Sequence, residues 1–231
     1  MNIVYAMTHH VYEWILPSLR SLKATNPDAC VYILAEDDAL PMKLPMPATV
    51  INVSGQKWFI PDGPNYNCSF KYINLVKVRY PTILKNLDRV IHLDIDTIVC
   101  DRLDEMWNID LDGKWFAMCA EEIQRFYRPF GPDYYNAGVM VLNLKQMRED
   151  GIEQPMQDYL NTVEGPWADQ DAWNKFGMEY DKIVRMPLRW NENMSTGKTN
   201  HPGIVHFVGI RDWFTRFDMP RVAYLNAYRK E

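Results

Sequence analysis

The first 35 residues alternate between strand-like and helix-like patterns, and this alternation restricts the fold more than any other feature. Residues 2–7 form a short apolar run, residues 11–24 repeat apolar side chains at helical spacing, and Cys30–Ala35 resembles a second buried strand. A strand, a helix and a strand in this order normally make a crossover between parallel strands. We therefore predict an α/β fold built on a parallel sheet.

The rest of the chain continues with short strands and helices and contains no repeat or linker. We expect strands at residues 49–53, Arg89–Leu93, 115–120, 137–144 and 204–208. Helices are expected at residues 70–84, where Pro81 should bend or break the helix, at 152–163, at 168–176 and weakly at 222–229. With 231 residues, 47% of them hydrophobic, the simplest organisation is one domain spanning residues 1–231.

Composition excludes several classes of protein. The net charge is −5 and basic residues form no long runs, which argues against a nucleic-acid partner. The four cysteines lack the spacing of a zinc site and suit a reducing compartment. No apolar run approaches the roughly 20 residues of a membrane span, and the apolar N-terminal segment is too short for a signal peptide. We expect a cytoplasmic protein whose oligomeric state is left open.

Two carboxylates interrupt the apolar run VIHLDIDTIVC at residues 90–100. Burying Asp94 and Asp96 is costly unless each is paired or binds a cation. Ligands of open α/β sheets bind beyond the carboxyl ends of the strands, where these residues are expected. Because side chains two apart on a strand share a face, we expect both carboxylates to reach one cation.

His206 is the candidate third ligand of this cation. It follows another short apolar strand, in the segment GIVHFVG. Carboxylates suit Mg²⁺ or Mn²⁺, and an added imidazole favours Mn²⁺. Taken singly, Asp94 and Asp96 could cap a helix or a turn, and His206 could be a core residue. The combination of all three favours a metal site.

Five segments in the same order resemble family 8 retaining glycosyltransferases, the group that includes glycogenin and bacterial lipopolysaccharide galactosyl- and glucosyltransferases. Residues 88–99 resemble the family segment "DkvlYLDaDvlv", and residues 135–144 resemble "fNaGvmliNl". The remaining matches are residues 169–174 with "DQDilN", residues 187–191 with "Lp.kyN", and residues 206–209 with "HfxG".

The resemblance implies a GT-A fold, a single Rossmann-like domain with a mixed, mostly parallel sheet. It implies that Asp94, Asp96 and His206, together with a donor diphosphate, hold Mn²⁺ or Mg²⁺, and that Ile95 also lies at the donor. A cation there would stabilise the charge that grows on the diphosphate as the sugar leaves.

The resemblance also implies the residues around the donor sugar. Asn136, Ala137 and Asp169 correspond to family contacts with the sugar, and Gln170 to the residue behind the anomeric carbon. An amide is a weak nucleophile, so we favour attack by the acceptor on the face that the leaving group vacates. The alternative for Asn136 and Gly138 is a tight turn entering a strand. Asp169 is also expected to cap the helix that follows.

Other positions match the family less closely. Ala6 and Thr8 correspond to base and ribose contacts, although the family has Ala-Asp at positions 7 and 8. Lys77, a candidate donor contact, stands where the family has an Arg, a replacement that keeps the charge but loses the planar fork. A solvated helix face is the alternative for Lys77.

Three further positions complete the candidate site. Gly209 and Arg211 stand near the family's diphosphate-binding Lys, at a spacing one residue shorter. Glu121 corresponds to an acidic residue near the sugar, with a simple surface charge as the alternative.

The resemblance implies a retaining, Mn²⁺-dependent transferase that moves a hexose from a nucleotide sugar, UDP-glucose or UDP-galactose. The acceptor could be a glycan, a lipid-linked sugar or a protein. One alternative is a catalytically silent module that binds a nucleotide sugar or a glycan, in line with the altered opening segment. Another is a metal-dependent nucleotidyltransferase, which the absence of a glycine-rich loop after the first strand disfavours.

Overall fold

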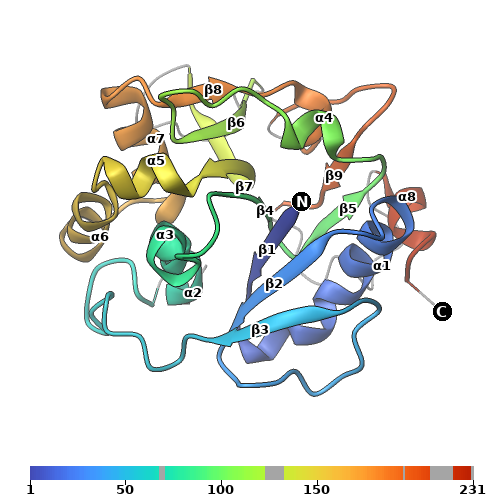
Figure 1. Ribbon diagram of the computed structural model, residues 1–231, viewed down its shortest axis with the longest axis horizontal. Coiled ribbons are helices and arrows are strands. Elements are labelled where there is room, and N and C mark those ends of the chain that lie inside the picture. The colour runs from blue at the N-terminus through green and yellow to red at the C-terminus, as the bar shows by residue number, and fades with distance from the viewer. Residues whose placement is uncertain (68–70, 123–132, 195, 209–220, 230–231) are drawn as a thin grey trace.

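In the computed structural model, a seven-stranded sheet crosses the molecule in the order β3-β2-β1-β4-β7-β6-β8 (Figure 1). Its strands are β1 (Asn2–Ala6), β2 (Cys30–Ala35), β3 (Ala48–Asn52), β4 (Arg89–Leu93), β6 (Phe116–Ala120), β7 (Tyr135–Asn143) and β8 (Ile183–Arg185). Every neighbouring pair is parallel except the two that involve β7. The structure describes residues 1–231 apart from 68–70, 123–132, 195, 209–220 and 230–231.

A second, two-stranded sheet pairs β5 (Thr97–Val99) with β9 (Ile204–His206) in antiparallel fashion, with Thr97 opposite His206. The chain leaves β4, turns at residues 94–96 and enters β5 in this other sheet. The prediction that Asp94 and Asp96 share one strand face was therefore wrong. The two carboxylates are instead brought together by the three-residue turn that carries the chain from the large sheet to the small one.

Helices cover both faces of the large sheet. They are α1 (Leu16–Thr25), α2 (Lys71–Leu75), α3 (Tyr80–Ile83), α4 (Asp104–Trp107), α5 (Leu144–Glu149), α6 (Glu153–Thr162) and α7 (Asp169–Glu179). The last helix, α8 (Val222–Asn226), packs against the two-stranded sheet instead. Alternation along β4 divides the core, since Val90 packs with side chains of α3 and α5–α7 while Ile91 and Leu93 pack with those of α1 and α4. The described residues include no helix long and apolar enough to cross a membrane.

Prolines explain where two predicted helices differ from the observed ones. The helix expected at 11–24 begins as a 3-10 helix, His9–Ile15, and becomes α1 only at Leu16, with Pro17 in the first turn. The helix expected at 70–84 consists of α2, the 3-10 helix Val76–Arg79 and α3, with Pro81 in the first turn of α3. Proline is tolerated there because the first N–H groups of a helix have no partner within it. The predicted break at Pro81 is confirmed.

Candidate active site

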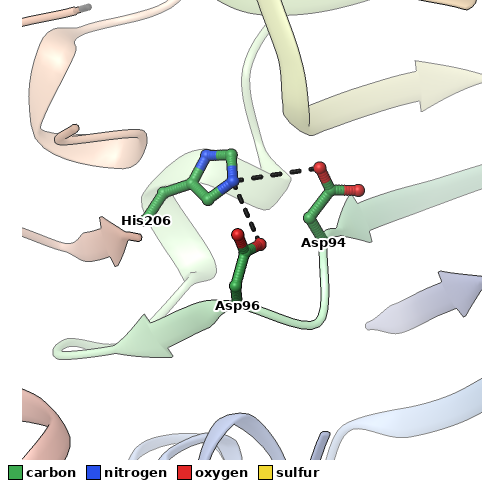
Figure 2. Close-up of side chains that lie close together, drawn as sticks. All are labelled: Asp94, Asp96 and His206. Carbon is green, nitrogen blue, oxygen red and sulfur yellow. Dashed lines mark ion pairs between the residues drawn. The ribbon is translucent and has the colours of Figure 1, made fainter. Parts of the chain in front are cut away.

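Asp94, Asp96 and His206 converge where the two sheets meet (Figure 2). One ligand atom from each lies within 4.8 Å of the others. The Nε2 atom of His206 is 3.2 Å from Asp96 Oδ1 and 3.8 Å from Asp94 Oδ2. Thr97 donates to the backbone oxygen of Asp94, and the backbone N–H of Phe207 donates to that of Asp96, so the turn carrying both acids is fixed on either side.

The imidazole of His206 is oriented for a cation. Its Nδ1 lies 2.9 Å from the amide oxygen of Asn191 and donates to it, whereas the buried Nε2 has no hydrogen-bond partner among the described residues. Burial alone would lower the pKa of His206, but the charges of Asp96 and Asp94 outweigh it and raise the pKa. An orphaned nitrogen facing two carboxylate oxygens fits Mn²⁺ or a similar divalent ion.

Gly138 leaves room for this cluster. A Cβ atom at this position would lie 2.1 Å from Cε1 of His206 and 2.9 Å from Oδ2 of Asp94. The alternative of a tight turn at Asn136 and Gly138 was wrong, because both residues lie inside β7. The glycine is required by the close approach of His206 and Asp94.

Two donors fix the other oxygen of Asp94. Oδ1 is 2.9 Å from Nζ of Lys77 and 2.9 Å from Nε2 of His92. Burial alone would raise the pKa of Asp94, but the charge of Lys77 and the hydrogen bond from His92 hold the pKa well below its usual range. Burial, with a further contribution from Lys77, lowers the pKa of His92 to about 4, so this imidazole is neutral at pH 7.

Lys77 is buried, with 2% of its surface exposed, so the alternative of a solvated helix face was wrong. Besides Asp94 it contacts Asp169, whose Oδ2 is 3.4 Å from its Nζ. Burial alone would lower the pKa of Lys77, but Asp169 and Asp94 raise it. Burial raises the pKa of Asp169 to about 6 against the opposing charge of Lys77. The lysine thus joins the metal candidates to the start of α7.

A pocket opens next to the three metal candidates. Its lining includes Asn136, Ala137, Asp169 and Gln170, all predicted at the donor sugar, together with Asp94 and His206. Its remaining lining residues include Lys77 and Glu121, as well as Asn74, Trp167 and Met194, which the motifs did not indicate. The structure therefore places two of the three metal candidates, Asp94 and His206, and the predicted sugar residues around one cavity, with Asp96 beside it.

Glu121 is buried, so the alternative of a simple surface charge was wrong. It accepts hydrogen bonds from the amides of Asn136, at 3.1 Å, and Gln170, at 3.4 Å. The amide oxygen of Gln170 in turn accepts from the backbone N–H of Ala137. Asn136 also accepts from Asn191, the residue that orients His206. A continuous hydrogen-bond network therefore joins the sugar side of the pocket to the metal side.

The start of α7 differs from the prediction that Asp169 caps it. The capping position is Ala168, which has a positive φ of 51°, and no side chain caps the helix. Asp169 is the first residue of α7 and its side chain lines the pocket instead. Asp171 fixes the segment that precedes α7, since its carboxylate accepts hydrogen bonds from the backbone N–H of Trp167 and from the hydroxyl of Tyr134.

Three other predicted donor contacts do not line this pocket, and two more fall where the structure makes no description. Ala6 and Thr8 lie at and just beyond the carboxyl end of β1, and Ile95 lies in the turn between the two acids, but none of the three lines the pocket. Gly209 and Arg211 lie outside the described residues.

Comparison with known proteins gives the family. Residues 43–214 match the model of glycosyl transferase family 8. The chain belongs to this family. A putative glycosyltransferase of Haemophilus influenzae is 25% identical over 214 residues, and the match covers 83% of this chain. Glycosyltransferase GlyB of Streptococcus pneumoniae is 22% identical over 63% of this chain. The chain spans 63% and 39% of the lengths of these two relatives.

Solved structures confirm the GT-A fold. An active-site mutant of LgtC superposes with a TM-score of 0.77 at 17% identity, covering 99% of this chain and 95% of LgtC. Galactosyltransferase LgtC in complex with donor and acceptor sugar analogs gives a TM-score of 0.75, covering 100% of this chain and 97% of that one. The mixed, mostly parallel sheet expected for family 8 is thus confirmed.

Proposed function

We propose that this protein is a metal-dependent retaining transferase that moves a hexose from a nucleotide sugar, UDP-glucose or UDP-galactose, to an acceptor. The acceptor is a glycan, a lipid-linked sugar or a protein. The observation that carries this proposal is the junction of the Asp94, Asp96 and His206 cluster with the pocket that Asn136, Asp169 and Gln170 line. The two cores packed on one sheet support a single domain.

Asp94, Asp96 and His206 would hold the divalent ion. When bound, the ion offsets the negative charge that develops on the departing diphosphate. Lys77 adds one positive charge beside Asp94, close to the same place. Lys77 balances only part of the negative charge of Asp94, Asp96 and Asp169. This side of the pocket therefore still favours a bound cation.

Gln170 and its neighbours would orient the sugar. The Gln170 amide is held at both ends, by the backbone N–H of Ala137 and by Glu121. An amide so restrained is a positioning group and a poor nucleophile, which supports attack by the acceptor on the face that the diphosphate leaves. Asn136 and Asp169 offer polar atoms to the hydroxyls of a hexose.

The test is a panel of UDP-sugars incubated with the protein and Mn²⁺, with released UDP as the measurement. We expect slow hydrolysis of one or a few donors without an acceptor, and no release after chelation by EDTA. Stabilisation by a UDP-sugar with no release under any acceptor would instead indicate a binding module. Release of pyrophosphate from a nucleoside triphosphate would indicate a nucleotidyltransferase.

A further inference from the structure

His92 lies beneath the candidate metal site and has no exposed surface. The backbone N–H of Asp94 still donates to Gly138 on β7, so the strand pairing continues one residue past β4. Asp94 and His92 therefore share a face of the sheet, as residues two apart do. The imidazole Nε2 meets Asp94 Oδ1 at 2.9 Å.

The partners of His92 determine which of its nitrogens carries the proton. An ionised carboxylate only accepts, so Nε2 must donate to Asp94. The other nitrogen, Nδ1, lies 3.0 Å from the hydroxyl of Tyr80 and accepts from it. Tyr80 is itself fully buried. A chain of two hydrogen bonds thus runs from Tyr80 through His92 to Asp94.

Lys77 contacts the same oxygen of Asp94, Oδ1, as His92 does. Lys77 lies in the 3-10 helix Val76–Arg79 and Tyr80 directly follows this helix, three residues after Lys77, a spacing at which side chains on a 3-10 turn eclipse one another. Both therefore face β4, and Asp94 Oδ1 accepts from Lys77 and His92 together. The oxygen left for a ligand is Oδ2, which faces the orphaned Nε2 of His206.

We propose that His92, held by Tyr80, is a positioning residue that fixes the Asp94 carboxylate so that it binds the cation through Oδ2 alone. The inference rests on the proposed function, because it requires a cation at Asp94, Asp96 and His206. It concerns a feature specific to this chain, since the family segment that residues 88–99 resemble has tyrosine at the position of His92. Without the His92 donor, Lys77 alone restrains Oδ1 and the carboxylate can rotate away from the ligand geometry.

The test is Mn²⁺ binding by the full chain, measured as free Mn²⁺ by electron paramagnetic resonance in the presence of UDP. His92→Phe removes the donor and is expected to weaken Mn²⁺ binding by about 10- to 100-fold, the usual effect of losing a group that orients a metal ligand. His92→Gln keeps an N–H near the position of Nε2 and should restore most of the affinity. Tyr80→Phe, which keeps the ring and leaves His92 in place, should cause a smaller loss, of about threefold to tenfold, below the range expected for His92→Phe.

Melting temperatures in EDTA, measured on the same variants, separate a folding defect from a binding defect. His201→Gln changes an exposed histidine and should leave Mn²⁺ affinity unchanged. If the wild-type protein binds no Mn²⁺ at millimolar concentration, the proposed metal site itself fails. If the wild-type protein binds Mn²⁺ and both His92→Phe and Tyr80→Phe bind it equally well, the role of His92 is overturned while the proposed function stands. Should His92→Phe fail to fold, Tyr80→Phe still decides, because wild-type Mn²⁺ affinity in that variant would overturn the role of His92.

Discussion

The metal side and the sugar side of the pocket are built in different ways. On the metal side, two carboxylates face a buried imidazole nitrogen that has no hydrogen-bond partner among the described residues. On the sugar side, Asn136, Gln170 and Glu121 satisfy one another through hydrogen bonds. Unpaired buried polar groups are costly, whereas a connected network is stable by itself.

This difference indicates how the two sides depend on ligands. The metal side is completed only by a cation, so its stability should vary with metal and with pH. The sugar side is preorganised and should keep its geometry without any ligand. Asn191 connects them, because it accepts from His206 and donates to Asn136. Substitutions on the metal side should therefore weaken or abolish binding of the cation and the donor, and substitutions on the sugar side should mainly reduce the rate of turnover.

The largest effect is expected from Asp96→Asn. An amide binds a divalent cation far more weakly than a carboxylate, so Mn²⁺ and donor binding should both be lost and UDP release should fall by about 1,000-fold or more. Released UDP and the Mn²⁺-dependent shift in melting temperature are the measurements. Asp112→Asn, at an exposed acid, is the matched control. A fully active Asp96→Asn protein would exclude the metal site proposed here.

The next largest effect is expected from Gly138→Ala. The added methyl group would lie 2.1 Å from His206 and must displace it from the acids. We expect Mn²⁺ affinity to fall by about 100-fold, as for other losses of ligand orientation. Gly55→Ala is the control, because no atom lies within 4 Å of a Cβ at that position. Wild-type Mn²⁺ affinity in Gly138→Ala would show that His206 is not constrained by β7.

Gln170→Ala tests the sugar side. It removes the amide that Ala137 and Glu121 hold in the pocket, so turnover should fall by about 10- to 100-fold while UDP affinity stays nearly constant. Single-turnover rates and UDP binding by calorimetry give the two quantities. An equal loss of both would mean that Gln170 contacts the nucleotide rather than the sugar, and the contrast between the two sides would fail.

The sheet could be predicted from the sequence because its strands are local apolar runs. Cys30–Ala35 and Arg89–Leu93 were predicted with their observed bounds. The three-residue strands β5 and β8 were not predicted, since their short runs become strands only by pairing with distant segments. The three metal candidates were found because carboxylates and an imidazole in apolar runs are unusual, but their convergence depends on the pairing of β5 with β9.

The residues that orient Asp94 and His206 could not be predicted from the sequence in this way. His92 lies in a buried strand and resembles an ordinary core residue until Tyr80 and Asp94 are seen on either side of it. Asn191 lies in a polar loop, and only the folded chain places it against His206. Supporting residues of this kind depend on contacts between distant segments, which periodicity does not reveal.

The smallest expected effect is the pH dependence of metal binding. In the metal-free protein, burial acts to lower the pKa of His206, but Asp96 and Asp94 raise it above the ordinary 6.5. A proton on Nε2 competes with the cation, so Mn²⁺ affinity should fall as the pH drops below this raised pKa, by at most about tenfold per pH unit. The protonated imidazole also stabilises the metal-free fold below pH 6.5, and this contribution is lost as the pH rises through the raised pKa. The increase in melting temperature on adding Mn²⁺ should therefore grow from pH 6 to pH 8. A constant increase over this range would indicate that His206 does not bind the cation.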